Sequence, residues 1–487
     1  MPPSPASPTI LRRSFPALAL VLLAGCATTD PKATLPAVQQ QIAARSDFAV
    51  SWPLDADERA ASDRAVQSLL NEELTPATAV QIALLNNRHL RATFEELGVS
   101  QADLAAATRL RNPTFAASVR WPDQLPRGPN VEFSLVADLL DDLLIPLRKK
   151  VAREQLAQAG HRVAHEVLSL AAEVKAAVYT VQARQLFADR LAAVAAVNAA
   201  ATELTQRKYD AGNIGRLDLN LQQFAAGQSR LEQARAEAQL KADREKVNRL
   251  LSLTATQNAW KIAAGLPALP GQEPALDQIE TVAIAQRLDL ALAASRIALA
   301  ESALALKRST RLLPVGLSLG VDTERESSGG RLTGPRLELG LPIFDQGQPE
   351  LARLGSELRR ALANHEALSA EIQSEVREAR DALLAARATV DTFTQTLLPQ
   401  RRLILQDTLL QYNAMQKSSY ELLAAKEQQL RAERESIEAL RDYWIARVQL
   451  ERALGGKLPG ASAPPAPKAE TLEGKTSGKE PAHHSHK

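Results

Sequence analysis

An internal repeat of about 200 residues constrains this chain more than any other feature of its sequence. Tyr209 opens the stretch Tyr-Asp-Ala-Gly, and Tyr412 opens the related stretch Tyr-Asn-Ala-Met 203 positions later. Asn112-Pro113 returns as Leu313-Pro314 after 201 positions. Solenoid repeats are only about 20–50 residues long, so a unit of this length is the size of a domain. The sequence therefore predicts two tandem copies of one design.

Each copy is expected to begin with two short helices and a strand hairpin. In the first copy, Thr75-Pro76 is a typical helix start, and helices are predicted over 77–85 and 88–110. Alternating apolar and polar residues then predict strands at 115–121 and 131–136.

The second copy shows the same alternation after its own helical region. It predicts strands at 315–322 and 336–342. Pro146 and Pro342 follow the hairpins of the first and second copy, and we expect them to mark the corners between strand and helix.

Long apolar seams follow the hairpins, with apolar or small residues at steps of three and four. In the first copy the seam predicts a helix over 147–208 that ends in a tip at 209–216. The second copy turns at 412–419 and returns to about Leu454, and Pro399 is expected to kink its outgoing helix. Seams of this length are typical of coiled-coil packing.

The composition agrees with closely packed long helices. Aromatic residues are 4% of the chain while hydrophobic residues are 45%, so the apolar content is mostly Ala, Leu and Val. A large mixed globular core normally uses more aromatic side chains. The sequence also lacks a P-loop, a GxGxxG after a strand, GxSxG and HExxH, so no enzyme activity and no cofactor are expected.

The charge balance excludes one class of partner. The whole chain has 58 basic and 56 acidic residues. Arg12 and Arg13 lie in a segment that we expect to be removed, which leaves a balance of zero in the mature chain. Nucleic-acid-binding proteins carry a basic excess, so no nucleic acid partner is expected.

The N-terminus has the pattern of a secretory signal. Arg12-Arg13 precede an apolar run of about ten residues, which is too short to span a bilayer. The quartet Leu23-Ala24-Gly25-Cys26 resembles a bacterial lipobox, which implies cleavage before Cys26 and lipidation of its sulfur. Ala27 follows, and by the same resemblance the destination is the outer membrane. The alternative is an ordinary signal peptide with an incidental cysteine.

The strand count has a consequence for any membrane-spanning role. Two hairpins supply four strands, and a membrane barrel needs at least about eight. A three-fold ring of this chain would supply twelve. The fold class expected from the sequence is thus mainly α with a small β-barrel.

The tip motifs carry a resemblance to a known family. The stretch from Tyr209 to Leu219, the looser stretch from Tyr412 to Leu423 and the corner Leu341-Pro342-Ile343-Phe344-Asp345 resemble the TolC-like outer-membrane efflux proteins, in their lipidated branch. The resemblance covers about residues 74–454. Met415 stands where Gly is usual, and the first copy's corner at 144–148 departs from the pattern.

The resemblance implies an assembly and a location. It implies a homotrimer with a twelve-stranded pore in the outer membrane and a helical tunnel through the periplasm of a Gram-negative bacterium. It also implies docking to a periplasmic adaptor protein and an inner-membrane pump. The expected function is passive export of small molecules or metal ions by a tripartite efflux system, or a conduit like that of type I secretion.

Site residues are also implied by the resemblance. Glu421, and Asp218 in the first copy, match or mirror the acidic residues that form the closed periplasmic aperture of this family. The residues expected to dock the adaptor lie at the tips: Tyr209, Gly212, Gly215, Leu217, Tyr412, Met415, Ser418 and Ser419.

The expected division of the chain follows from the repeat and the resemblance. It comprises a signal peptide (1–25), an N-terminal linker or equatorial segment (26–73), the first repeat (74–254), a linker (255–275), the second repeat (276–454) and a disordered tail (455–487).

Two groups of histidines are candidate metal ligands. His161 and His165 are four residues apart on a predicted helix, but no third ligand is evident, so a solvated helix face is the preferred interpretation. The tail contains His483, His484 and His486, and such clusters bind Cu, Ni or Zn weakly.

Other function classes compete with the channel interpretation. A periplasmic coiled-coil structural lipoprotein without a pore would fit the helices, but it would not need the strand hairpins. An adaptor protein would have one helical hairpin within β-domains, whereas this chain has two.

Overall fold

The chain forms two compact units that do not coincide with the two copies of the repeat. The structure, a computed structural model, describes residues 30–121, 123, 128–274, 276–313, 315–326 and 328–459. Unit 1 comprises the chain up to Gln41, Leu90–His165 and Leu288–Leu368, and unit 2 comprises Ile42–His89, Glu166–Arg287 and the chain from Ser369 onward. Each unit therefore takes corresponding parts of both copies.

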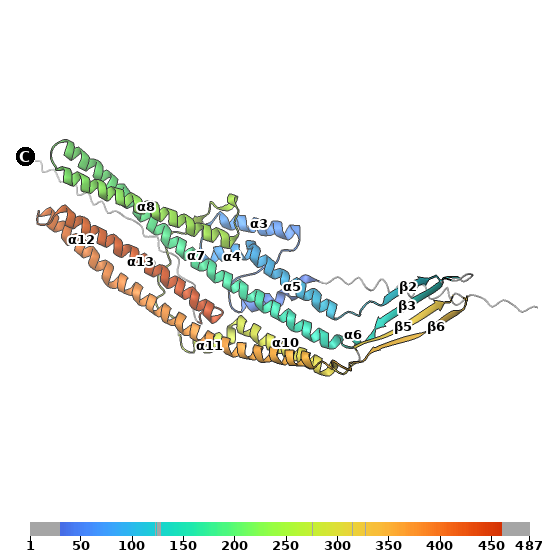
Figure 1. The fold of residues 1–487 in the computed structure, drawn as a ribbon. Helices are drawn as coiled ribbons and strands as arrows, with labels where there is room; N and C mark the ends of the chain where they lie inside the picture. Colours follow the sequence, from blue (N-terminus) through green and yellow to red (C-terminus); the bar gives the residue numbers. More distant parts are fainter. Residues whose placement is uncertain are drawn as a thin grey trace, which may run out of the picture. The chain divides into compact units, whose positions relative to one another are not determined.

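Unit 1 contains a four-stranded antiparallel sheet in the order β2-β3-β5-β6 (Figure 1). The strands are β2 (Thr114–Arg120), β3 (Asn130–Asp138), β5 (Val315–Arg325) and β6 (Arg331–Gly340). Both predicted hairpins are confirmed, since β2 pairs with β3 and β5 pairs with β6. The pairing of β3 with β5 joins the hairpin of one copy to that of the other.

Three of the four strands are longer than predicted. β2 has seven residues, but β3, β5 and β6 have nine, eleven and ten. β6 begins at Arg331 and ends at Gly340, whereas the prediction was 336–342. Pro335 lies within β6, which in the described chain pairs only with β5, and a residue without a backbone N–H is tolerated in a strand whose other side is open.

The two faces of the sheet have opposite character. Phe115 and Leu135 are cross-strand partners on one face, and Leu135 is also the partner of Val321. These side chains are half-exposed or more, with Phe115 at 65%. On the other face Arg120 lies 2.7 Å from Glu132 and 3.9 Å from Glu324. The sheet thus presents an apolar surface on one side and charged side chains on the other.

Short and long helices complete unit 1. They are η1 (Pro31–Thr34), most of α2 (Leu35–Ala43), most of α5 (Arg88–Ala107), α6 (Leu139–Leu143), the start of α7 (Ile145–Asp210), α10 (Leu288–Thr310) and the start of α11 (Gln348–Thr392).

The two strand-to-helix corners are built differently. Pro146 is the second residue of α7, where a helix needs no backbone N–H. Pro342 lies in a non-helical turn that ends at Gly347, with Asp345 Oδ1 accepting a hydrogen bond from the Gly347 N–H at 2.7 Å. Gly347 has φ +81°, and a Cβ there would lie 2.8 Å from Lys307 Cε, so this turn requires glycine.

Unit 2 holds the remaining elements. They are α3 (Ala56–Leu70), β1 (Glu73–Leu74), α4 (Pro76–Asn86), the rest of α7, α8 (Arg216–Leu251), η2 (Ala255–Gln257), β4 (Lys261–Ile262), α9 (Ile279–Gln286), the rest of α11, the π-helical turn η3 (Phe393–Leu397), α12 (Leu398–Asn413) and α13 (Ser419–Leu454). In segment 26–73, expected as a linker, the structure has helices α2 and α3.

The helix start predicted at Thr75-Pro76 is confirmed by its hydrogen bonds. Thr75 Oγ1 accepts a hydrogen bond from the Thr78 N–H at 3.1 Å, and Thr78 Oγ1 accepts one from the Thr75 N–H at 2.8 Å. This reciprocal pair is a capping box, and it fixes the first turn of α4.

The long helices agree with the apolar seams. α7 runs for 66 residues and includes the predicted span 147–208. Val163, Val167 and Val181 on its seam are fully buried. Figure 1 shows the last part of α7 beside α8, and α12 beside α13. Each pair forms a helical hairpin.

At Pro399, where a kink was predicted, the structure has a π-helical turn. η3 directly precedes α12, whose second residue is Pro399. Proline clashes with the carbonyl of the residue four positions earlier, here Gln395, which lies inside η3. The wider π turn accommodates that clash within a continuous run of helix.

The core of unit 2 is centred on Trp444 of α13. Its ring lies 5.4 Å from that of Tyr179 and 5.3 Å from that of Tyr443, measured between ring centroids. Its Nε1 donates a hydrogen bond to the Pro267 carbonyl at 2.9 Å. Residues from both copies therefore meet in this core, together with the segment that links them.

Candidate functional site

The two tips have the same backbone hydrogen bonds. At the first tip the Gly212 N–H donates to the Tyr209 carbonyl at 2.9 Å, and at the second the Met415 N–H donates to the Tyr412 carbonyl at the same distance. Matching bonds run from Asn213 to Lys208 and from Gln416 to Gln411. All of these pairs obey the shift of 203 residues, so the structure confirms that the tips correspond.

The tips differ in the residue that takes the left-handed conformation. Gly212 has φ +73°, and its counterpart Met415 has φ +58°. A residue with a Cβ is strained there by roughly 1–2 kcal/mol relative to glycine. The Met415 side chain is also 94% exposed, so side-chain packing within the described residues does not offset the strain. A strained, exposed apolar residue at a tip favours a contact role over a purely structural one.

The helices that leave the tips are capped differently. Ser418 caps α13, since its Oγ accepts a hydrogen bond from the Glu421 N–H at 3.3 Å, and Ser419 is the first helical residue. Glu421 Oε2 in return accepts the Ser418 N–H at 2.9 Å. The corresponding cap of α8 is Gly215, which offers no side chain, and Asp218 lies in the first turn.

Glu421 is held by its neighbours. Lys417 Nζ lies 2.5 Å from Glu421 Oε1. The hydrogen bonds from Lys417, and then those from Ser418, lower the pKa of the Glu421 carboxyl to about 2. The carboxylate is therefore charged at neutral pH, but Lys417 balances its charge within the same chain. Glu421 was predicted as a site residue and Lys417 was not, because Lys417 lies in the loop before α13, where helical spacing gives no signal for the pair.

Apolar side chains are exposed around both tips. Leu217, the second residue of α8, is 71% exposed, and Tyr209 and Tyr412 are each more than a third exposed. The two helical hairpins carry further exposed apolar residues: Leu204, Leu221 and Phe224 near the first tip, and Leu403, Leu409 and Leu410 near the second. Apolar surface of this extent is typical of surfaces that contact another protein.

Several predicted residues lie outside the described residues. These are the signal peptide, Cys26, and the tail histidines His483, His484 and His486. Among the described residues, the structure brings no three potential ligands together as a metal site. His161 instead contacts Gln41 Oε1 through Nδ1 at 3.2 Å.

In the described ranges, no helix combines the length and the apolar character needed to cross a bilayer.

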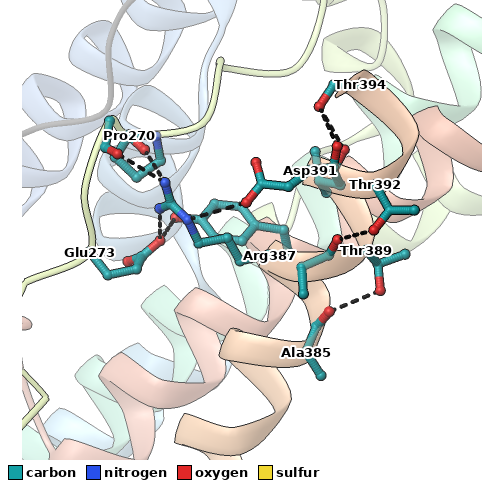
Figure 2. Close-up of polar contacts among 12 residues, drawn as sticks. Pro270, Glu273, Ala385, Arg387, Thr389, Asp391, Thr392 and Thr394 are labelled. Atoms are coloured by element: carbon teal, nitrogen blue, oxygen red, sulfur yellow. Dashed lines mark hydrogen bonds and ion pairs between the residues drawn. The ribbon is translucent and has the colours of Figure 1, made fainter. Parts of the chain in front are cut away.

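A polar cluster in unit 2 was not predicted from the sequence. It forms around the segment 252–278 between α8 and α9, which we call the connector. Glu273 Oε1 in the connector accepts hydrogen bonds from Arg387 Nη1 at 2.7 Å (Figure 2) and from Tyr443 Oη at 2.6 Å. Burial, then the hydrogen bond to Glu273, raise the pKa of Tyr443. The signal that could have found this cluster is that Arg387 and Arg447 stand 203 positions after Arg184 and Arg244.

Comparison with known proteins gives relatives of similar length and fold. No protein-family model matches the chain. The chain is 23% identical over 387 residues to the cobalt-zinc-cadmium resistance protein CzcC of Cupriavidus metallidurans, which covers 78% of this chain and 90% of the relative.

Solved structures resemble it over most of its length. A CusC structure, described in terms of folding and transmembrane channel formation, has a TM-score of 0.66 at 16% identity and covers 79% of this chain and 92% of its own. The CmeC outer membrane channel of Campylobacter jejuni has a TM-score of 0.66 at 14% identity, and the match covers 86% of this chain and 91% of the CmeC chain. The resemblance seen in the tip motifs is thus confirmed at the level of the fold: this chain has the fold of the TolC-like outer-membrane efflux channels.

Proposed function

We propose that this chain belongs to the TolC-like family and is the outer-membrane channel subunit of a tripartite efflux system. The observation that carries the proposal is the four-stranded sheet. In the described chain its outer strands β2 and β6 each pair on one side only, and its apolar face is exposed. Open strand edges and an exposed apolar face favour assembly with further strands in an apolar environment.

In the proposed assembly, three copies close twelve strands into a barrel and six helical hairpins into a tunnel. The exposed apolar residues of the hairpins then become contacts between neighbouring copies or with the adaptor. Cys26 is the proposed lipid anchor, and the two-repeat division of the chain at 74–254 and 276–454 is part of the same proposal.

The tips are the proposed docking surface for a periplasmic adaptor, which in turn contacts an inner-membrane pump. Met415 supports this role most directly, because a glycine would make the turn without strain. Glu421 and Asp218 are the proposed aperture residues. Since Lys417 pairs with Glu421, we propose that the aperture is a ring of ion pairs and not of bare carboxylates.

The cargo is proposed to be small molecules or metal ions, with metal ions preferred. The relative CzcC is named for resistance to cobalt, zinc and cadmium. The chain itself is proposed to be a passive conduit and not an enzyme, with the pump supplying the energy.

Planar-bilayer recording of the purified full-length protein, with its mass measured in detergent, tests the proposal. We expect a trimeric mass and stepwise conductance. A monomer without conductance would contradict the channel and leave the alternative of a periplasmic coiled-coil structural lipoprotein. Deletion of the gene followed by exposure to metals, dyes and antibiotics then tests the cargo.

A further inference from the structure

The second strand-to-helix corner brings two exposed segments together. β5 begins at Val315 and β6 ends at Gly340, and these two residues are partners in the sheet. The segments on their helix side therefore leave the sheet from the same place. A Cβ on Gly347 would lie 2.8 Å from Lys307 Cε and 3.5 Å from Arg311 Cβ. The end of α10 and the turn after β6 thus form one continuous surface.

The turn after β6 supplies the apolar part of this surface. Leu341, Ile343 and Phe344 are exposed, with Phe344 at 98%. Leu341 continues the two-residue spacing of Leu337 and Leu339, which lie on the exposed apolar face of the sheet. The exposed apolar surface therefore extends from the sheet into the corner, and a surface of this kind is typical of contact with another molecule.

The end of α10 supplies the basic part of this surface. Residues 302–314 include Lys307, Arg308 and Arg311 and no acidic residue. Arg308 and Arg311 are exposed and Lys307 is half-buried. A stretch with a charge of +3 stands out in a chain whose mature form is balanced overall. We call Lys307, Arg308, Arg311, Leu341, Ile343 and Phe344 the corner patch.

The acidic residues that follow β6 do not cancel this charge. Asp345 Oδ1 accepts a hydrogen bond from the Gly347 N–H at 2.7 Å, and Glu350 Oε1 lies 2.6 Å from Arg353 Nη2. Both carboxylates therefore already have partners in the chain. Residues 302–314 and 341–353 together contain four basic and two acidic residues, so the whole corner keeps a net charge of +2.

The first copy does not have this combination. The positions 201 residues before the three basic residues are occupied by Ala106, Ala107 and Leu110. Phe344 is the second residue after Pro342, whereas the second residue after Pro146 is Arg148. A strand-to-helix corner can therefore form without the residues of the corner patch, so the fold alone does not account for them.

We propose that the corner patch binds anionic phospholipid in the periplasmic leaflet of the outer membrane. Exposed Phe and Leu beside Lys and Arg are the combination with which proteins bind an anionic membrane surface. The apolar side chains contact the acyl chains, and the guanidinium groups of Arg308 and Arg311 bind the lipid phosphate, whose geometry suits the planar fork of arginine. The inference rests on the proposed function, which places the sheet in the membrane, and it adds which lipid the protein selects there.

Native mass spectrometry of the full-length protein in a neutral detergent tests this selection. Phosphatidylglycerol and phosphatidylcholine with identical acyl chains are titrated separately, so that any difference in affinity reports the headgroup. A basic residue beside an anionic lipid surface contributes up to about fivefold in affinity, so phosphatidylglycerol should bind roughly tenfold more tightly than phosphatidylcholine. Raised salt should reduce this preference, because it screens exposed charges.

Substitutions separate the two parts of the patch. Arg308→Gln with Arg311→Gln should remove most of the preference for phosphatidylglycerol and leave the affinity for phosphatidylcholine unchanged. Arg308→Lys with Arg311→Lys keeps the charge and should keep most of the preference. Phe344→Ser should weaken the binding of both lipids by the same factor, because it removes only apolar contact.

The matched control removes the same charge from another part of α11. Arg359 and Arg360 are exposed and lie about 17 Å along the helix from its first residue, which exceeds the screening length of about 10 Å at 0.1 M salt. Arg359→Gln with Arg360→Gln should leave the preference unchanged.

Four results would overturn the proposal. These are equal affinity for the two lipids, an equal loss of preference in the control, displacement of phosphatidylglycerol by inorganic phosphate, which would indicate a site for free anions, and dissociation of the trimer in the Arg308→Gln and Arg311→Gln variant, which would indicate a contact between copies. Conductance in phosphatidylcholine bilayers is measured separately. Its absence together with a preserved lipid preference would count against the channel alone.

Discussion

The two tips share one backbone and carry different side chains. Both close with the same hydrogen bonds, 203 residues apart, yet the first uses Gly212 and Gly215 where the second uses Met415 and Ser418. The first tip is the unstrained version of the turn. The second accepts strain at Met415, adds a capping box and pairs Lys417 with Glu421. The difference indicates that the second tip is the more specialised of the two.

The largest expected difference between the copies concerns Trp444 in the core of unit 2, whose counterpart in the first copy is Lys241. Trp444→Ala should lower the free energy of unfolding by about 3–5 kcal/mol, because it removes a fully buried ring stacked on Tyr179. The matching residue of the first copy is the exposed Lys241, and Lys241→Ala should stay within about 0.5 kcal/mol. Urea unfolding followed by circular dichroism measures both. Equal losses would mean that the copies contribute equally to the core.

The second-largest expected effect comes from exchanging the two residues with left-handed backbone conformation, Gly212 and Met415. Met415→Gly should stabilise the second tip by about 1 kcal/mol, and Gly212→Met should destabilise the first by a similar amount. A Cβ at Gly212 meets nothing within 4 Å, so the expected loss comes from the backbone alone. Urea unfolding of the two variants and the double exchange measures this. If Met415→Gly weakens binding to an adaptor while it raises stability, the contact role of Met415 is supported.

The smallest effect concerns pH and the capping box of the second tip. The folded pKa of Glu421 is about 2, below the ordinary value of 4.5, so the pairing stabilises the folded chain fully above about pH 4.5. That contribution is lost as the pH falls through about 2. Glu421→Gln should therefore be less stable than the unmodified protein at neutral pH, and the difference should shrink between pH 4.5 and 2. A difference independent of pH would contradict the charge-based role of Glu421.

Much of the fold followed from periodicity. The apolar seams predicted the long helices, and the alternation at Phe115 and Phe133 predicted strands, because these patterns reflect which face of an element is apolar. The positive φ of Met415 also follows from its alignment with Gly212 once the repeat is recognised. These features depend on residues close together in the chain.

The polar cluster of the connector was not predicted, because its sequence signal, the shift of 203 residues between Arg184 and Arg387, does not identify Glu273. Glu273 and Arg387 are 114 positions apart, and neither belongs to a motif. Their pairing depends on which helices the connector crosses, which is a property of the tertiary fold. The predicted linker at 255–275 thus includes most of the residues that join the two repeats, and its polar side chains carry no local signal of that role. Three of the four strands were predicted too short for a similar reason, since the place of Pro335 within β6 depends on the pairing of β6 with β5 and not on local sequence.

The interleaving of the copies in the two compact units has a consequence for how the chain is made. Unit 1 needs Leu288–Leu368 from the second copy, and unit 2 needs the chain from Ser369 onward. A chain that has emerged only as far as the connector therefore lacks part of both units, and its apolar seams have no complete partner. Neither unit can finish folding before the second copy is available, so contacts far apart in sequence limit the rate. Pairings within the first copy, such as β2 with β3, can form early, but both units stay incomplete until the second copy arrives, and the apolar surface left open in that interval favours aggregation and proteolysis.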